Sequence, residues 1–165
     1  MNEVNTANVT DRRRLRFASL DDVIADVERI VAADRAGNLR RTGNWTAGQC
    51  FGHLAAWMTF AYEGFPMRRP PWFIRWLIRR KKAKYLHEGM PAGVRIPGVK
   101  GGTAATEPLS IEEGAARLRR AIQRLKSNEP EKFESPAFGP LSHEERVALN
   151  LRHAELHLSF LHPGP

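Results

Sequence analysis

The sequence predicts an all-α fold, and three observations support this class. Apolar residues recur at the spacing of an α-helix in four long segments, at about 20–36, 46–63, 110–127 and 141–161. A residue that can cap the N-terminus of a helix stands at the start of each segment or next to it. No pair of segments shows the alternation of two strands joined by a hairpin turn. Together with a shorter basic helix, these four amphipathic segments predict a helical bundle.

The starts of the four long helices are predicted by their capping residues. A capping box places Ser or Thr three positions before an acidic or amide side chain, so that each satisfies a backbone N–H of the other. The four pairs with this spacing are Ser19 and Asp22, Thr46 and Gln49, Ser110 and Glu113, and Ser142 and Glu145. Trp45 precedes the second cap, and we expect it to fold back onto Cys50 as a hydrophobic staple.

Length and composition indicate one domain preceded by a tail. A chain of 165 residues is long enough to enclose one hydrophobic core, and its 42% of apolar residues excludes a wholly disordered chain. No apolar run approaches the roughly 18–20 residues of a membrane span. Because the first residues lack helical periodicity, we expect a flexible N-terminal tail at 1–18 and a single helical domain at 19–162.

The N-terminus and the cysteine content bear on the cellular compartment. Residues 1–16 are polar and have no apolar central segment, so they do not form a secretory signal. Cys50 is the single cysteine, which excludes an internal disulfide framework and suits a reducing environment. We therefore expect a cytoplasmic protein.

A strongly basic segment lies in the middle of the chain. Residues 68–84 (Arg68–Lys84) contain eight Lys and Arg residues and no carboxylate, in a chain with a net charge of +8. A helix at about 72–86 carries most of these cations, with aromatic residues between them. It could lie on an anionic membrane surface or grip a phosphate backbone. The interpretation that we favour is a bundle helix with a solvated basic face.

Two irregular connections follow the basic helix. Residues 87–108 contain five glycines and three prolines and form a long loop. Loops of this length are uncommon in compact domains and are usually functional or mobile. Residues 128–140 are also irregular and lead into the last helix.

Three histidines fall on the predicted apolar faces of two helices. His153 and His157 are four residues apart on the last helix, a spacing that stacks two imidazoles on one face. His53 lies on the apolar face of the second helix, about one turn beyond Cys50. Each histidine alone is typical of a core residue whose polar atoms a neighbour satisfies. Together they supply the three imidazoles that a catalytic zinc site uses, so a metal site is the alternative interpretation.

Further residues near these histidines are weaker candidates. Cys50 could be a fourth ligand, although we favour a small buried thiol. Asn150 could accept a hydrogen bond from a ligand histidine, or it could be an amide at the edge of the core. We expect His87, His143 and His162 to be solvated. No general acid or base stands out, and the sequence has no phosphate-binding glycine motif, zinc finger or RNA-binding signature.

The pattern around the histidines resembles a known superfamily. Its residues are Gly43-Asn44-Trp45-Thr46, Gln49, His53 and Leu54, the turn Phe138-Gly139-Pro140-Leu141, and His153-x-x-x-His157. Over residues 20–160 the chain is similar to the DinB/YfiT-like metalloenzymes. More narrowly, it resembles an uncharacterised branch of that superfamily.

The resemblance implies an up-down four-helix bundle with a long crossover connection, often dimeric. It implies that His53, His153 and His157 bind a divalent metal, usually zinc or nickel, at one end of the bundle. Characterised relatives are metal-dependent transferases that activate a low-molecular-weight thiol, or a thiol-dependent isomerase. A small-molecule substrate would then enter beside the loop at 87–108. Ser135 stands where relatives often have a histidine. This difference leaves the three-histidine set intact, but the resemblance then does not identify which reaction the protein catalyses.

The sequence leaves two functions open. The first is a metal-dependent enzyme of the thiol S-transferase type. The second is a bundle without catalysis that uses residues 68–84 to bind an anionic partner, either a membrane surface or a nucleic acid.

Overall fold

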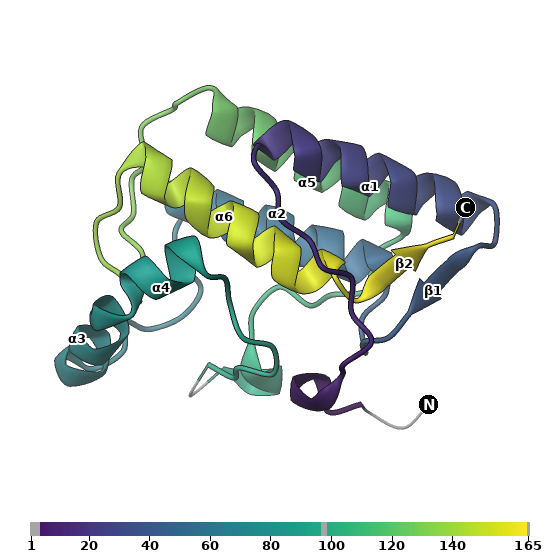
Figure 1. Ribbon diagram of the computed structural model, residues 1–165. Helices are drawn as coiled ribbons and strands as arrows, with labels where there is room; N and C mark the ends of the chain where they lie inside the picture. Colours follow the sequence, from purple (N-terminus) through teal and green to yellow (C-terminus); the bar gives the residue numbers. More distant parts are fainter. Residues whose placement is uncertain (1–3, 97–98, 165) are drawn as a thin grey trace.

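The computed structural model describes residues 4–96 and 99–164, and this part of the chain is mostly helical, as the sequence predicts (Figure 1). The α-helices are α1 (Leu20–Arg35), α2 (Ala47–Glu63), α3 (Trp72–Arg80), α4 (Lys82–His87), α5 (Ile111–Lys126) and α6 (His143–Leu158). The shorter elements are the 3-10 helices η1 (Thr6–Asn8) and η2 (Lys100–Gly102) and the strands β1 (Leu39–Arg41) and β2 (Leu161–Pro163).

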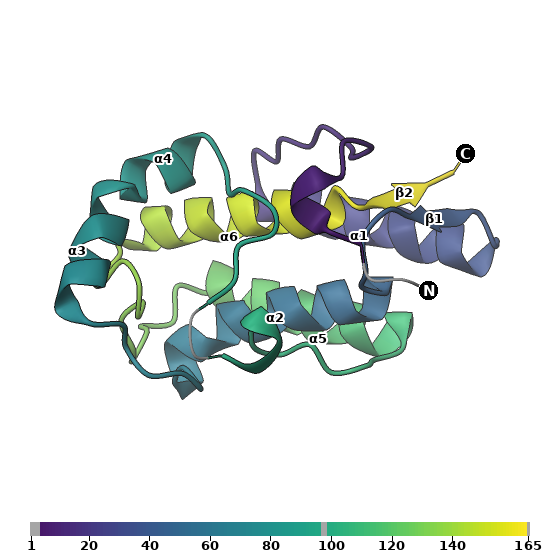
Figure 2. The ribbon, with the colours of Figure 1, turned by 90° about the horizontal axis from the view of Figure 1, so that it is seen from below.

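The four long helices α1, α2, α5 and α6 enclose one hydrophobic core. Its largest fully buried apolar side chains include Ile30, Phe51, Leu54, Leu118 and Leu158. Figure 2 shows the arrangement as two layers, with α2 beside α5 and α1 beside α6.

The predicted caps form at the starts of these helices. Reciprocal capping boxes join Ser19 to Asp22, Thr46 to Gln49, and Ser142 to Glu145. At α5 only half of the box is present, because Ser110 accepts a hydrogen bond from the Glu113 backbone while the Glu113 carboxylate binds Arg117. The capping pattern in the sequence therefore locates the start of every long helix.

Ion pairs and close contacts define the directions of the helices. Three ion pairs that run along α1 and α5 show that these helices are antiparallel: Asp21–Lys126, Glu28–Arg119 and Arg35–Glu112. In contrast, α2 and α5 run the same way, since Gly48 meets the start of α5 and Glu63 pairs with Arg124 near its end. A long connection, residues 64–110, must therefore return the chain from the end of α2 to the start of α5.

The start of α5 packs against α2 at glycines. A Cβ atom added at Gly48 would lie 2.2 Å from the carbonyl oxygen of Leu109, and one at Gly52 would lie 2.4 Å from the Cδ1 atom of Leu109. A Cβ atom at Gly114 would lie 2.5 Å from the carbonyl oxygen of Gly48. The two backbones approach this closely because glycine has no side chain at these positions.

A small antiparallel sheet corrects the expectation that no strands pair. The two strands β1 and β2 align Leu39 with Pro163 and Arg41 with Leu161. Strands of three residues are too short to show an alternating pattern, and proline and arginine are not typical of strands. The last helix is accordingly shorter than predicted and ends at Leu158, because Leu161 belongs to β2.

The basic helix predicted at 72–86 is two helices. Its backbone leaves the helical conformation at Lys81, which ends α3 and precedes α4. Like charges three and four residues apart across this break, Arg79 with Lys82 and Arg80 with Lys84, disfavour an uninterrupted helix. Neither piece is one of the four core helices, and no residue of α3 is fully buried.

Residues 4–18, which the sequence assigns to a flexible tail, contact the helices at several points. The Arg13 guanidinium binds both carboxylate oxygens of Asp26, at 2.8 and 2.6 Å, and its backbone N–H donates to the carbonyl of Ser159. Phe17 is buried and donates its backbone N–H to Glu155. This segment therefore joins α1 to the end of α6.

No helix in the described part of the chain has both the length and the apolar composition needed to cross a bilayer.

Candidate metal centre

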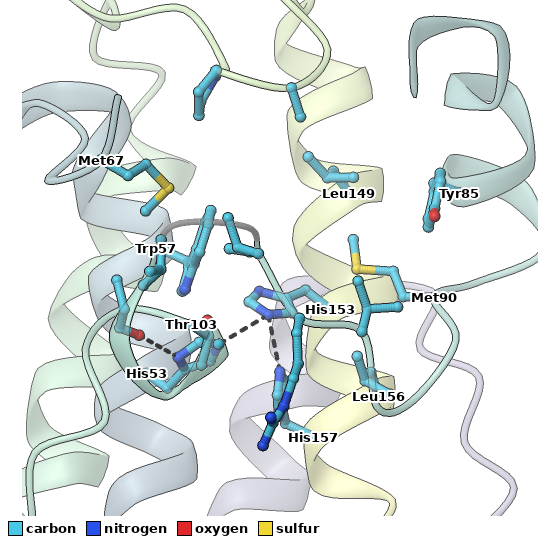
Figure 3. Close-up of a pocket in the computed structure, with 18 of the residues that line it drawn as sticks. His53, Trp57, Met67, Tyr85, Met90, Thr103, Leu149, His153, Leu156 and His157 are labelled. Atoms are coloured by element: carbon cyan, nitrogen blue, oxygen red, sulfur yellow. Dashed lines mark hydrogen bonds between the residues drawn. The ribbon is translucent and has the colours of Figure 1, made fainter. Parts of the chain in front are cut away.

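His53 from α2 and His153 and His157 from α6 converge on one point (Figure 3). The Nε2 atom of His153 lies 3.2 Å from the Nε2 atom of His53 and 3.0 Å from that of His157. One ligand atom from each of the three residues lies within 4.8 Å of the others. The structure thus brings together all three histidines that the sequence selects.

A hydrogen bond to the loop fixes which nitrogen of His53 faces the other two rings. The Nδ1 atom of His53 lies 2.9 Å from the carbonyl oxygen of Ala104. A carbonyl oxygen only accepts, so Nδ1 carries the proton and Nε2 of the neutral ring presents a bare lone pair. This is the arrangement in which an outer acceptor orients a metal-binding histidine.

The three facing nitrogens cannot all satisfy one another as neutral rings. His53 Nε2 is an acceptor, and His153 Nε2 lies between it and His157 Nε2. A single N–H on His153 Nε2 could point well at one neighbour but not at both. A cation shared by the three lone pairs removes this conflict, and tetrahedral nitrogen ligands about 2.0–2.1 Å from zinc lie about 3.3 Å apart. The observed spacings of 3.2 and 3.0 Å are close to that value.

The surroundings keep the imidazoles neutral. Burial lowers the pKa of His53 to about 4, and His53 is only 1% exposed. Burial, together with repulsion between the rings when they are protonated, holds the pKa of both His153 and His157 well below the usual range. At neutral pH the lone pairs are therefore free to bind a metal ion.

Two tryptophan rings pack against the triad. The Trp45 ring stacks on His157 with a centroid distance of 5.0 Å and an angle of 8° between the planes. The Trp57 ring meets His153 edge to face at 5.9 Å. The sequence predicted Trp45 as a hydrophobic staple, and the stacking on His157 is a contact that it did not predict.

The weaker candidates have other partners or environments. Cys50 is buried, and burial raises the pKa of its thiol to about 12, so it is a neutral core residue rather than a thiolate ligand. Asn150 donates to the carbonyl of Arg146 on its own helix. His87 is exposed, His143 is half-buried, and His162 lies in β2 with Nε2 3.4 Å from the Thr42 hydroxyl.

The triad forms part of the wall of a large cavity. The cavity has a volume of about 1510 Å³ and is lined by the basic helices, the loop at 87–108 and the N-terminal segment, as well as by α2 and α6. Most of the wall near the triad is apolar, and its members in Figure 3 include Trp57, Met67, Tyr85, Met90, Leu149 and Leu156. The Trp57 Nε1 atom is buried there without a hydrogen-bond partner in the described part of the chain.

Two residues that contact the histidines or their helix were not predicted by any sequence motif. Ala104 acts through its backbone carbonyl, so the sequence indicates this region only by the unusual length of the glycine-rich loop. Arg12 comes from the N-terminal segment, where it donates to the carbonyl of Leu156 and to the Ser159 hydroxyl. Its charge adds to the effects that lower the pKa of His157.

Comparison with known proteins gives one result at the level of the family. No curated protein and no solved structure matches the chain significantly. The sequence model of a family described as "Protein of unknown function (DUF1569)" matches residues 9–164. The matched region contains all three histidines, both strands and all six described α-helices. The chain belongs to this family, DUF1569.

Proposed function

We propose that this protein is a DinB-like metalloprotein in which His53, His153 and His157 bind a divalent ion, either zinc or nickel. The observation that carries the proposal is the convergence of three Nε2 atoms while Nδ1 of His53 is tied to Ala104. The four core helices and the long return between α2 and α5 are in keeping with a DinB-like bundle and its crossover.

The chemistry that we propose is activation of a small thiol. His53, His153 and His157 would hold the ion, which when bound would lower the pKa of a thiol or water and make that nucleophile available at neutral pH. The chain supplies neutral lone pairs, and the Ala104 carbonyl fixes the orientation of one of them. Trp45 and Trp57 restrict water around the rings.

The cavity indicates what kind of second substrate fits. Its volume of about 1510 Å³ is ample for a small molecule, and its wall beside the triad is mainly apolar. The unpartnered Nε1–H of Trp57 can donate to an acceptor on such a molecule. We therefore propose a metal-dependent thiol S-transferase whose electrophilic substrate has an apolar body and at least one hydrogen-bond acceptor.

Metal analysis of the purified, untagged protein tests the site. Wild type is expected to hold about one zinc or nickel ion per chain, and His157→Ala is expected to lose it. His87→Ala is the matched control, because His87 is exposed and outside the triad, and it should keep the metal. A wild-type protein that contains neither metal and takes up neither on dialysis would overturn the proposal.

A second assay tests the reaction. Metal-loaded wild type is incubated with a low-molecular-weight thiol and a chromogenic aryl chloride, and thioether formation is followed by absorbance. We expect a rate above that of His157→Ala. If wild type and His157→Ala reacted at equal rates with every thiol in a range of thiols, the proposed transferase activity would be refuted. The proposed metal site would not be affected by that result.

A further inference from the structure

The outer side of α3 presents a row of large apolar side chains to solvent. Trp72 is 78% exposed, Phe73 51%, Trp76 53% and Leu77 55%. At the helical spacing of 100° per residue these four side chains occupy one continuous arc. Single exposed apolar residues are ordinary, but four on two turns of one helix form a patch that normally marks an interaction surface.

The opposite side of α3 is in contact with the rest of the protein. Ile74 and Ile78 are half-buried and line the same cavity as the histidines, while Arg79 reaches Gly139. The inner side thus fixes the helix at one end of the molecule, beside α4 (Figure 1). Within the described part of the chain, the exposed arc is therefore the outer side of a helix whose inner side is already packed.

The basic segment that contains α3 carries unpaired positive charge. Three of the eight cations in residues 68–84 pair with carboxylates, in the contacts Arg69–Glu134, Lys82–Glu145 and Lys84–Glu88. The other five form no ion pair with a described residue, and they are Arg68, Arg75, Arg79, Arg80 and Lys81. Arg80 also lies over the Trp76 ring, 4.6 Å from its centroid.

We propose that α3 docks this protein on an anionic lipid bilayer, with the aromatic arc at the level of the headgroups. Tryptophan and phenylalanine beside cationic side chains are the composition of helices that lie in a membrane interface. The cations would meet acidic headgroups while the rings bury apolar area just below them. Docking of this kind needs no membrane-spanning helix, and it does not depend on the metal site.

Other occupants fit the patch less well. A second copy of the chain docked on this patch would bring two unpaired basic clusters together, and their like charges would repel. A nucleic acid could pair with the cations and stack on the rings. It would not bury Leu77, whose exposed apolar surface has no counterpart in a phosphate backbone. A bilayer satisfies both the charge and the apolar surface.

Vesicle sedimentation tests the apolar part of the proposal. Wild type is expected to bind vesicles of phosphatidylglycerol and phosphatidylcholine and not vesicles of phosphatidylcholine alone. The double variant Trp72→Ser, Trp76→Ser should bind the anionic vesicles at least about tenfold more weakly, because two large apolar side chains no longer enter the interface. The control Val4→Ser, Phe133→Ser removes two exposed apolar side chains elsewhere and should bind as wild type does.

A second pair of variants tests the charge. Arg80→Ser, Lys81→Ser should lose about tenfold in affinity for anionic vesicles, since each cation at the surface contributes to the attraction. Arg14→Ser, Arg120→Ser changes the net charge equally at exposed positions outside α3 and should lose less than about threefold. High salt should weaken wild-type binding, and a blue shift of tryptophan fluorescence should accompany binding and be absent from Trp72→Ser, Trp76→Ser.

Four results would overturn docking on a bilayer. They are no wild-type binding to anionic vesicles at low salt, equal loss in the matched controls, tighter α3-dependent binding to duplex DNA than to vesicles, and an α3-dependent dimer that does not bind vesicles. Circular dichroism verifies that each variant is folded. If an α3 variant loses its helical spectrum, the proposal is tested on the wild type alone. Wild-type binding must then weaken in high salt and be accompanied by the blue shift of tryptophan fluorescence, and the absence of either would overturn the proposal.

Discussion

The two sides of α2 differ in how they meet their neighbours. Towards α5, the backbone packs directly against backbone and side chains at Gly48 and Gly52, and α2 has its most extensive contacts there. Towards α6, the same helix presents His53 and Trp57 to a cavity of about 1510 Å³. One side of a single helix is thus closely packed, and the other leaves space and unsatisfied polar atoms.

This difference separates the part of α2 that holds the fold from the part suited to chemistry. Close packing gains dispersion contacts and tolerates little change in volume. Buried lone pairs that face one another cost free energy, and they persist when a ligand resolves the conflict. On this reasoning the side towards α5 determines stability, and the side towards α6 determines binding.

The largest effect on stability is expected for Gly48→Ala. The new methyl group would lie 2.2 Å from the Leu109 carbonyl oxygen and 2.6 Å from that of Ser110, and backbone atoms cannot move aside as a flexible side chain can. We expect the free energy of unfolding to fall by about 2–3 kcal/mol, measured by urea denaturation. The loss should appear although alanine favours an α-helix over glycine by about 1 kcal/mol.

Ala25→Val is the control for the effect of enlarging a helical side chain. Ala25 is exposed on α1, so valine should cost only its lower helix propensity, about 0.5 kcal/mol. If Gly48→Ala proved as stable as wild type, the close approach of α2 and α5 would not be a source of stability.

Zinc binding is expected to have an effect of comparable size, and it tests whether the two sides of α2 are independent. At a free zinc concentration of about 100 Kd, the free energy of unfolding of wild type should rise by about 2.7 kcal/mol. His157→Ala should show no such increase. Gly48→Ala should show the full increase, because its substitution acts on the other side of the helix. A much smaller increase in Gly48→Ala would show that packing on α5 also shapes the metal site.

Much of the fold could be predicted from the sequence because its strongest determinants are local. Capping residues such as Ser142 and Glu145 act within one turn, and apolar spacing identifies the buried face of each helix. The strand pair depends on a contact between residues 39–41 and 161–163, which are far apart in the chain and too short to carry a pattern. The division of the basic helix at Lys81 is likewise not marked by a proline or glycine.

In the candidate site, the three histidines could be predicted from the sequence, but the residues that surround them could not. His153 and His157 could be paired from their spacing, and His53 from its place on an apolar face. Ala104 could not be predicted, because a backbone carbonyl carries no residue-type signal and its position depends on how a long loop folds. Arg12 was hidden for a related reason, since its segment lacks periodicity yet reaches α6 through tertiary hydrogen bonds.

The N-terminal segment is held by a buried ion pair, unlike the close packing at the glycines of α2. Loss of this ion pair is expected to have a moderate effect on the free energy of unfolding. Asp26 is 1% exposed and bound by Arg13 and Arg29. Burial alone would raise the pKa of Asp26, but the hydrogen bonds from the two arginines outweigh it and lower the pKa below its ordinary value. Asp26→Asn should therefore lower the free energy of unfolding at pH 7 by about 2 kcal/mol.

The pH dependence of that loss follows from the direction of the shift. A carboxylate whose pKa is lowered on folding stabilises the protein above its unfolded pKa, and this contribution disappears as the pH falls through the folded value. The difference between wild type and Asp26→Asn should thus be full near neutral pH and shrink below about pH 4. Asp21→Asn, at an exposed ion pair with Lys126, is the control and should change little at any pH. A difference at pH 7 that persists unchanged in acid would refute the ionic origin of the effect.

The smallest effect is expected for the ring that covers His157. Trp45 stacks on this imidazole, and aromatic pairs contribute about 0.5–1.5 kcal/mol beyond the area they bury. Trp45→Leu removes the planar contact but keeps an apolar side chain, so zinc affinity measured against a chromophoric chelator should weaken by about tenfold or less. Trp45→Phe should restore most of it, and Trp72→Leu, on the exposed arc of α3, should leave it unchanged. If Trp45→Leu bound zinc as wild type does, the wall around the triad would only fill space, and the loop carbonyl at Ala104 would be the main element that orients the ligands.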